Sequence, residues 1–271
     1  MAGRALLMGI IAIFMANASF GVVEIDQTLA LAGGITPSDT PGFPVTIDQT
    51  GSYILTGNLT VPDANTTAIV VTAEGVTLDL NGFAIIGPAT EAGPNGTGVG
   101  IQGGAGIVVF NGTIRGMGSI GLQMDSRSRA EKLHLYYNAT GLTASVDSLI
   151  TEVIAGRNRL DGIFVGSDTT IARCVTNENL RDGIRVTGSR CIIIGNVATD
   201  NDRYGISTGT DCSLIQNNAS RNLSHGMTLA AGTGYAQNII NANNGGNSNP
   251  QVSNGGIQIG TNICGGDTIC P

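Results

Sequence analysis

The segment Asn158-Arg-Leu-Asp-Gly-Ile-Phe-Val165 recurs as Asn179-Leu-Arg-Asp-Gly-Ile-Arg-Val186 and as Asn201-Asp-Arg-Tyr-Gly-Ile-Ser-Thr208. All copies contain a glycine followed by an apolar residue. That pair occurs seven times, with steps of 21, 20, 21, 21, 22 and 21 residues, at Gly100-Ile101, Gly121-Leu122, Gly141-Leu142, Gly162-Ile163, Gly183-Ile184, Gly205-Ile206 and Gly226-Met227. A period held over seven members indicates stacked structural units rather than a globular fold.

Each repeat contains short strands. After the glycine, Ile163 and Val165 alternate with Phe164, as Ile184 and Val186 do with Arg185, which places Phe164 and Arg185 on the outer face. A second apolar run follows about eight residues later. The connections between these strands are too short to contain crossover helices. The sequence therefore predicts an all-β fold, a single-stranded right-handed parallel β-helix (a solenoid) with coils of about 21 residues.

Asparagines form a second periodic series. Each stands four residues before a glycine of the main series, and Asn138 is one residue out of step. Asparagine tolerates the left-handed backbone of a sharp turn, and stacked amides can hydrogen-bond to one another. The pattern predicts a structural ladder of Asn158, Asn179, Asn201 and Asn222.

The N-terminal residues have the pattern of a secretion signal. Arg4 precedes an apolar run from Ala5 to Met15, and Ala16-Asn17-Ala18 is a small-x-small cleavage site. We therefore expect a signal peptide at residues 1–18 and an exported protein that is secreted, periplasmic or held at the cell surface. An uncleaved anchor is the alternative, although the run is shorter than a bilayer span.

The rest of the chain divides into three parts. Residues 19–43 are predicted to cap the solenoid with a short helix, which has Asp26 as its N-cap and ends at Gly33. Residues 44–261 form the β-helix, interrupted by insertions at Pro88–Gly96 and Gly245–Gly255. Insertions in solenoids often collect on a binding face. Residues 262–271 form a C-terminal tail.

The five cysteines are consistent with an oxidising compartment. Cys264 and Cys270 lie six residues apart in the tail, where we predict a disulfide. Cys174, Cys191 and Cys212 stand in apolar strand patterns and are expected to be buried thiols.

Composition excludes several classes of function. A net charge of −7 argues against nucleic acid as a partner. Nothing after the signal resembles a membrane span. Two histidines make a zinc site improbable, and no cofactor is expected, although calcium bound through Asp161 and Asp182 is left open. The sequence does not determine the oligomeric state.

With the coils in register, the chain resembles the pectin-lyase-like right-handed parallel β-helix superfamily. The resemblance covers Pro44 to Thr261 and is carried by Val76-Thr-Leu-Asp-Leu-Asn-Gly-Phe83 and the Asn-x-x-x-Gly-Ile coils. More narrowly, the chain is similar to exported bacterial β-helix proteins of unassigned function, on Ala32-Gly-Gly-Ile-Thr-Pro-Ser-Asp-Thr-Pro-Gly-Phe-Pro44 and Cys264-Gly-Gly-Asp-Thr-Ile-Cys-Pro271. The superfamily resemblance implies enzymes that cleave or epimerise acidic polysaccharides. The Asn-Thr-Asp, Asp-Asp and Gly-His-Gly motifs of polygalacturonases are absent, so that activity is not expected.

One set of residues is a candidate site. The residues just before successive series glycines should stack on neighbouring coils about 4.8 Å apart, with two arginines beside them. The candidate catalytic residues are Asp161, Asp182, Arg181, Arg203, Tyr204 and His225. Tyrosine and histidine could move a proton at C5 of a uronic acid while arginine binds its carboxylate.

The match to known epimerases is partial. The resemblance to uronate C5-epimerases rests on Tyr204-Gly205-Ile206, the opening of their Tyr-Gly-Phe-Asp-Pro-His motif, and Ser207-Thr208-Gly209 departs from the remainder. Aromatic residues that could stack on sugar rings are Tyr136, Tyr137, Phe164 and Tyr204.

Three hypotheses for function follow. The first is a non-catalytic exported module that binds glycan or a surface, or that has a structural role, with polysaccharide as its partner. The second is a polysaccharide lyase or uronate C5-epimerase that uses the candidate residues. The third is a fibre or envelope accessory protein, in which exposed strand edges at the solenoid ends promote association.

Overall fold

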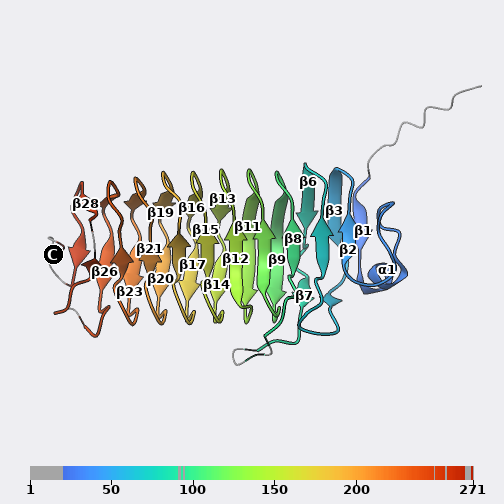
Figure 1. Ribbon diagram of the computed structural model, residues 1–271, viewed down its shortest axis with the longest axis horizontal. Coiled ribbons are helices and arrows are strands. Elements are labelled where there is room, and N and C mark those ends of the chain that lie inside the picture. The colour runs from blue at the N-terminus through green and yellow to red at the C-terminus, as the bar shows by residue number, and fades with distance from the viewer. Residues whose placement is uncertain are drawn as a thin grey trace, which may run out of the picture.

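The computed structural model confirms the predicted fold class, a parallel β-solenoid with a single short helix among the residues described (Figure 1). The structure describes residues 21–90, 93, 95–246, 248–253, 255–265 and 270. The predicted signal peptide therefore lies outside the described residues. Within the described part, no helix is long and apolar enough to cross a membrane.

The strands form two parallel sheets that run the length of the solenoid. The ten-stranded sheet contains β2 (Val45–Ile47), β5 (Ile69–Val71), β8 (Ile101–Gly103), β10 (Ile120–Met124), β12 (Thr140–Ala144), β15 (Ile163–Val165), β18 (Ile184–Val186), β21 (Ile206–Ser207), β24 (Met227–Thr228) and β27 (Val252–Ser253).

The nineteen-stranded sheet covers the other two sides of each coil. It contains β1 (Val23–Ile25), β3 (Gly51–Leu55), β4 (Leu59–Thr60), β6 (Val76–Asp79), β7 (Ala84–Ile86), β9 (Val108–Arg115), β11 (Arg129–Tyr136), β13 (Leu149–Thr151), β14 (Ile154–Gly156), β16 (Thr170–Ala172), β17 (Val175–Asn177), β19 (Ile192–Ile194), β20 (Val197–Thr199), β22 (Ser213–Ile215), β23 (Asn218–Ser220), β25 (Gly234–Ala236), β26 (Ile239–Asn241), β28 (Ile257–Gln258) and β29 (Ile263–Cys264).

A typical coil has three strands and three sharp corners. In the coil of β15, β16 and β17, the corners are at Asp168, Arg173 and Glu178, each with a positive φ, of 56°, 54° and 53°. The sequence analysis identified two apolar runs in each repeat and missed the third strand, because one left-handed residue separates β16 from β17 and no glycine marks it. A left-handed conformation costs an ordinary residue about 1–2 kcal/mol.

Opposite charges pair between the corners of neighbouring coils. Ion pairs with N–O distances of 2.6–3.2 Å join Arg173 to Glu152, Arg157 to Glu178, Arg190 to Asp168 and Arg221 to Asp200. These pairs are exposed, so each contributes little to stability. Other corner positions stack like charges, since Glu178 and Asp200 follow β17 and β20 at the same corner of adjacent coils.

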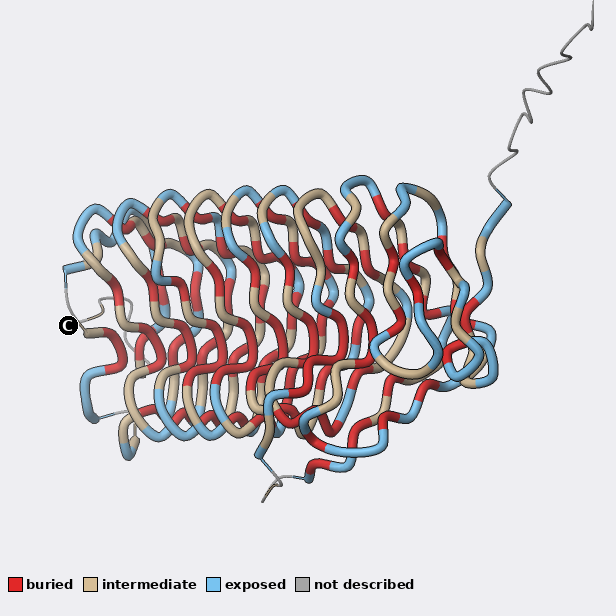
Figure 2. Tube along the Cα trace, turned by 45° about the vertical axis from the view of Figure 1, so that its right-hand side comes forward, coloured by how far each residue is buried: buried red, intermediate tan, exposed pale blue. Residues whose placement is uncertain are grey.

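The interior consists of apolar columns. Ile163 and Val165 of β15 are fully buried and lie in register with Ile184 and Val186 of β18. Buried residues recur at the same positions on successive coils (Figure 2). The alternation that predicted Phe164 and Arg185 on the outer face is therefore confirmed, since both are half-buried between these inward residues.

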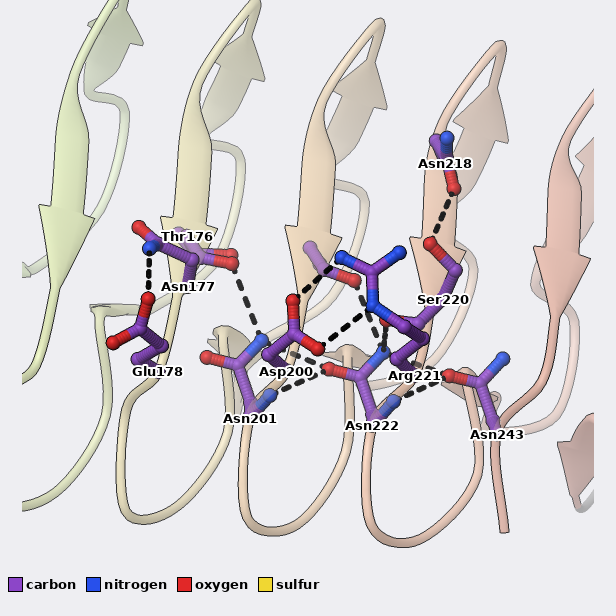
Figure 3. A network of polar contacts seen from close by, with 11 residues as sticks. Thr176, Asn177, Glu178, Asp200, Asn201, Asn218, Ser220, Arg221, Asn222 and Asn243 are labelled. Carbon is purple, nitrogen blue, oxygen red and sulfur yellow. Dashed lines mark hydrogen bonds and ion pairs between the residues drawn. The ribbon is translucent and has the colours of Figure 1, made fainter. Parts of the chain in front are cut away.

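Buried asparagines form the predicted ladder beside the apolar core (Figure 3). Asn201 Oδ1 accepts hydrogen bonds from the backbone N–H and Nδ2 of Asn179, and its own Nδ2 donates to the carbonyl of Thr176 and to Asn222 Oδ1. The described ladder comprises Asn138, Asn158, Asn179, Asn201, Asn222 and Asn243, and Gln251 accepts the last bonds. Asn138 thus belongs to the ladder despite its shifted position in the sequence.

A second ladder was not anticipated. Asn196, Asn217, Asn238 and Asn262 repeat the same hydrogen-bonding pattern at the corner between the two strand series of the larger sheet. The earlier coils carry Val153 and Cys174 before the corresponding strands, so the series begins only at Asn196, in the last third of the chain.

The two ends are closed differently (Figure 1). At the N-terminal end, helix α1 (Gln27–Ala32) is capped by Asp26, whose carboxylate accepts from Leu29 N–H at 2.8 Å, and it ends at Gly33 as predicted. Strand β1 adds a rung by pairing with β3. Near the C-terminus a disulfide joins Cys264 to Cys270, with their Cα atoms 5.2 Å apart.

Replacing Asn201 by alanine should lower the free energy of unfolding by about 1–3 kcal/mol, because the Asn179 backbone N–H and the Thr176 carbonyl each lose a partner inside the protein. Asn218→Ala is the control, since Asn218 is half-buried and its Oδ1 accepts a hydrogen bond from Ser220 Oγ within its own strand. Its effect should stay within about 0.5 kcal/mol. Urea denaturation measures both, and equal effects would contradict a structural role specific to the ladder.

Candidate functional site

The predicted site residues lie on one edge of the solenoid, where each coil leaves the larger sheet and enters the ten-stranded sheet. Asp161, Asp182, Tyr204 and His225 occupy the same position on four successive coils. Backbone hydrogen bonds record this stacking: Gly162 N–H donates to the Asp182 carbonyl, Gly183 N–H to that of Tyr204, and Gly205 N–H to that of His225, at 3.0, 2.9 and 3.2 Å. The structure thus brings together the column that the sequence predicted.

The two aspartates are buried and bound from several sides. Their side chains are 5% and 1% exposed. Asp161 Oδ1 accepts from the backbone N–H of Asp182 at 3.2 Å, and Asp182 Oδ1 accepts from that of Tyr204 at 3.4 Å. Arg181 and Arg185 each approach Asp161 to 3.7 Å, and Arg203 approaches Asp182 to 3.7 Å. The carboxylates therefore lie beneath the guanidinium groups.

Burial shifts the protonation of Asp182. Loss of hydration, together with the neighbouring Asp161 carboxylate, raises the pKa of Asp182 above its ordinary value, and Arg203 opposes this rise. Two carboxylates on adjacent coils repel one another, and the neighbouring arginines offset this repulsion.

Arginines also cover the aromatic rings of the site. The Arg203 guanidinium lies 4.5 Å from the centroid of the Tyr204 ring, and that of Arg185 lies 5.4 Å from the Phe164 ring. The rings of Tyr204 and His225 are 6.1 Å apart, and Ser224 Oγ is 3.4 Å from His225 Nδ1. Tyrosine, histidine and arginine therefore meet at one place, as predicted.

Sequence reasoning did not assign Arg185 to the site. It lies on strand β18, three residues after Asp182, and reaches back to the carboxylate of the preceding coil. Its outward position next to Phe164 was the available signal, because outward residues of adjacent strands are neighbours across the sheet.

Tyr136 and Tyr137 lie elsewhere. They stand at the end of β11 in the larger sheet, where they line a recess of about 290 Å³ with Arg157. Arg157 Nη1 donates to Tyr137 Oη at 3.1 Å, and Tyr136 Oη is 3.0 Å from His134 Nδ1. Of the four predicted stacking residues, only Phe164 and Tyr204 therefore belong to the candidate site.

Both insertions emerge at the same corner as the site. One connects β7 to β8. The other connects β26 to β27 and ends earlier than the predicted Gly255, because Val252 and Ser253 form β27 and pair with β24. The column of Asp161 to His225 stands on the coils between the two connections. The first of these loops projects visibly from the solenoid (Figure 1). Arg159 holds it near the column by donating to the carbonyls of Thr90 and Gly118, at 3.3 and 2.8 Å. A recess of about 420 Å³ remains beneath Asn95 and beside Leu160.

Metal ligands are sparse. Among the residues that the structure describes, no three His, Cys, Asp or Glu side chains are grouped so that they could hold a metal ion. Calcium at Asp161 and Asp182 would have to compete with the three arginines for the carboxylate oxygens.

Comparison with known proteins identifies the architecture. The family model described as "Right handed beta helix region" matches residues 45–220. No curated protein matches the chain.

Solved structures share the fold at low sequence identity. The A-module of the mannuronan C-5 epimerase AlgE6 from Azotobacter vinelandii is 15% identical, with a TM-score of 0.62 over 77% of this chain and 68% of that one. A mutant of the periplasmic alginate epimerase AlgG is 14% identical, with a TM-score of 0.57 over 81% and 70%. The AlgE4 A-module from the same Azotobacter species is 16% identical, with a TM-score of 0.53 over 75% and 72%. At these identities the likeness shows the fold alone.

The buried carboxylate of Asp182 should make stability depend on pH in a defined direction. Its pKa in the folded protein is raised above 3.8, so stability falls as the pH rises from 3.8 through the raised value. Asp182→Asn cannot lose stability in this way. Across that window the variant should therefore gain stability relative to wild type: its free energy of unfolding minus that of wild type should increase as the pH rises.

Asp200→Asn is the control with the opposite sign. Its hydrogen bond from Arg221 lowers the pKa of Asp200, so the wild-type carboxylate contributes stability above 3.8 and loses it as the pH falls. Urea denaturation from about pH 3 to about pH 7 tests both variants. If the stabilities of both variants relative to wild type changed in the same direction with pH, burial would not be the dominant influence on the pKa of Asp182.

Proposed function

The chain belongs to the right-handed β-helix family, and we propose that it binds a uronate-containing polysaccharide at the edge that carries Asp161, Asp182, Tyr204 and His225. The observation that carries this proposal is the layering of charge at that edge. The side chains of Arg181, Arg185 and Arg203 are 33%, 32% and 45% exposed, whereas the two carboxylates beneath them are nearly inaccessible. A ligand would therefore meet cations and aromatic edges rather than carboxylates.

The chemistry of arginine suits an acidic sugar. The guanidinium group is planar, keeps its charge and can bind a carboxylate through two parallel hydrogen bonds. Arg203 and Arg185 are held against Tyr204 and Phe164, which limits the side-chain freedom that binding would otherwise remove. Successive coils present these groups at intervals of about 4.8 Å, which suits an extended polymer.

The overall charge does not oppose this interaction. The net charge of −7 is spread over the chain, and exposed charges farther apart than about 8 Å are largely screened at physiological ionic strength. The local arrangement of three arginines over two buried aspartates therefore determines what a sugar carboxylate meets. We further propose that binding takes place after export, on the basis of the signal pattern in residues 1–18.

Proton transfer at the same site is the second candidate function. Tyr204 and His225 stand close enough for a sugar ring to contact both, and Arg203 lies over the tyrosine ring. Such a pair could remove the proton next to a uronate carboxylate and either return it to the other face, as in epimerisation, or allow the leaving group to depart, as in a lyase. Ser207-Thr208-Gly209 in place of Asp-Pro-His favours binding as the main function.

Arg185→Ala should weaken binding of oligouronates by about tenfold or more, since a hydrogen bond to a charged group contributes about 1.5–3 kcal/mol. Arg173→Ala is the matched control, because Arg173 pairs with Glu152 at the corner between β16 and β17, within the larger sheet and away from the site. Calorimetric titration of alginate, pectate and hyaluronan oligomers, with a neutral glucan for comparison, measures the effect. Repeating the titration with calcium and with a chelator tests the metal. Unchanged affinity in Arg185→Ala would refute the proposed site.

Tyr204→Phe and His225→Ala distinguish binding from catalysis. If the pair moves a proton, each variant should lose about 10²–10⁴-fold in rate while oligomer binding stays within a few-fold of wild type. Ultraviolet absorbance of unsaturated chain ends detects cleavage, and proton NMR of the polymer detects epimerisation. Wild-type protein that binds the oligomers but gives no product in either assay would leave the site a binding site without catalysis.

A further inference from the structure

Two cysteines lie side by side inside the solenoid. Strands β19 and β22 pair with Ile192 opposite Ser213, so the residues before them, Cys191 and Cys212, occupy equivalent positions on adjacent coils. Ser213 N–H donates to the Cys191 carbonyl at 2.8 Å, which extends the pairing to this point. Both residues are buried, at 1% and 3% exposure, and both are free cysteines.

Other coils carry hydroxyl residues at this position. The column continues through Ser128, Ser148, Thr169 and Thr233. The Ser148 and Thr169 hydroxyls donate to the carbonyl two residues earlier, as do the Cys191 and Cys212 thiols. A hydroxyl therefore satisfies the hydrogen bonding of this column, and local packing does not require sulfur on two consecutive coils.

The spacing fits a covalent bond. Paired residues on neighbouring strands lie about 4.7–4.9 Å apart, and disulfides join Cα atoms about 4.4–6.8 Å apart. The adjacent Cys191 side chain lowers the pKa of the Cys212 thiol to about 7, and the Cys212 side chain together with burial raises the pKa of Cys191. A thiolate is the species that attacks a disulfide.

We propose that Cys191 and Cys212 form an intramolecular disulfide that joins two adjacent coils. The Cys212 thiolate attacks RSSR, a small-molecule or protein disulfide, which releases one RS⁻. Cys191, after losing its proton, then displaces the second RS⁻ from the mixed disulfide. The two protons pass to the released thiolates, so two cysteine thiols and RSSR give the disulfide and two RSH. The bond forms while the coils are still open to the donor, because the finished core buries both sulfurs.

The disulfide would join coils that carry the candidate site, although its formation does not depend on the function of that site. Cys191 lies on the coil that begins with Asp182 and Arg185, and Cys212 lies on the coil that begins with Tyr204. The disulfide would thus fix two of the coils that carry the site.

Cys174 provides an internal control. It is equally buried, but its neighbours on the adjacent coils are Val153 and Asn196, so no second sulfur stands beside it. Burial also raises the pKa of its thiol to about 12. Cys174 should therefore remain reduced under conditions in which the pair is oxidised.

Trypsin separates the three cysteines. Cleavage at arginine releases Cys174–Arg181, Cys191–Arg203 and Tyr204–Arg221 as different peptides. The exported full chain, refolded with excess oxidised glutathione, is denatured without reductant, alkylated and digested. We expect the peptides Cys191–Arg203 and Tyr204–Arg221 to be joined by a bond that reductant breaks. We expect Cys174 to be alkylated. The linked pair should persist in Cys174→Ser and be absent from Cys212→Ser, which should carry alkylated Cys191.

Two results would overturn the proposal. One is alkylation of all three cysteines in the glutathione-treated wild type. The other is a mixture of linkages that includes Cys174, which would indicate pairing in the unfolded chain. A second measurement compares how far reduction lowers the urea midpoint in two proteins. The Cys191→Ser, Cys212→Ser double variant retains only the Cys264–Cys270 disulfide. Reduction should therefore lower the midpoint of wild type by more than it lowers that of the double variant. Equal decreases would likewise overturn it.

Discussion

In-register parallel pairing is the constraint on which the rest of this structure depends. Each residue lies on its counterpart one coil away, about 4.8 Å distant, so every side chain must be compatible with the side chain above and below it. Isoleucine on isoleucine satisfies this inside the coil, as between β15 and β18. Asparagine on asparagine satisfies it at the buried corners, because an amide both donates and accepts. At several charged corners an arginine pairs with a carboxylate of the adjacent coil.

The candidate site is where this rule of like on like is broken. Its column reads Thr140, Asp161, Asp182, Tyr204 and His225, so that no two neighbours after the aspartates are alike. The two aspartates are a costly pair in a buried position, and three arginines from the same edge are required to offset their repulsion. A repeat protein tolerates such departures mainly where they serve a function, since local conflicts otherwise reduce foldability.

The sequence predicted the features that a recurring residue type marks along most of the chain, and missed those without such a mark. The glycine series and the alternation around Phe164 determined the solenoid and its inner face, and the Asn158 series predicted the first ladder. The third strand was hidden because corners such as Arg173 reach a left-handed conformation without glycine. The second ladder was missed because it begins only at Asn196, and Arg185 because its contact to Asp161 crosses between coils. Such contacts depend on the register of the stack, which a period shows only approximately.

The mixed column also determines how a polymer could bind. A uniform ladder would allow a regular polysaccharide to slide from coil to coil with little change in energy. Here the coils after the two aspartates offer different groups, and the connections β7–β8 and β26–β27 stand on either side of the column along the solenoid. A chain of identical sugars would therefore have one preferred register, in which its carboxylates meet the arginines. Only in that register would one particular sugar lie against Tyr204 and His225, so the selection of register precedes any chemistry at this edge.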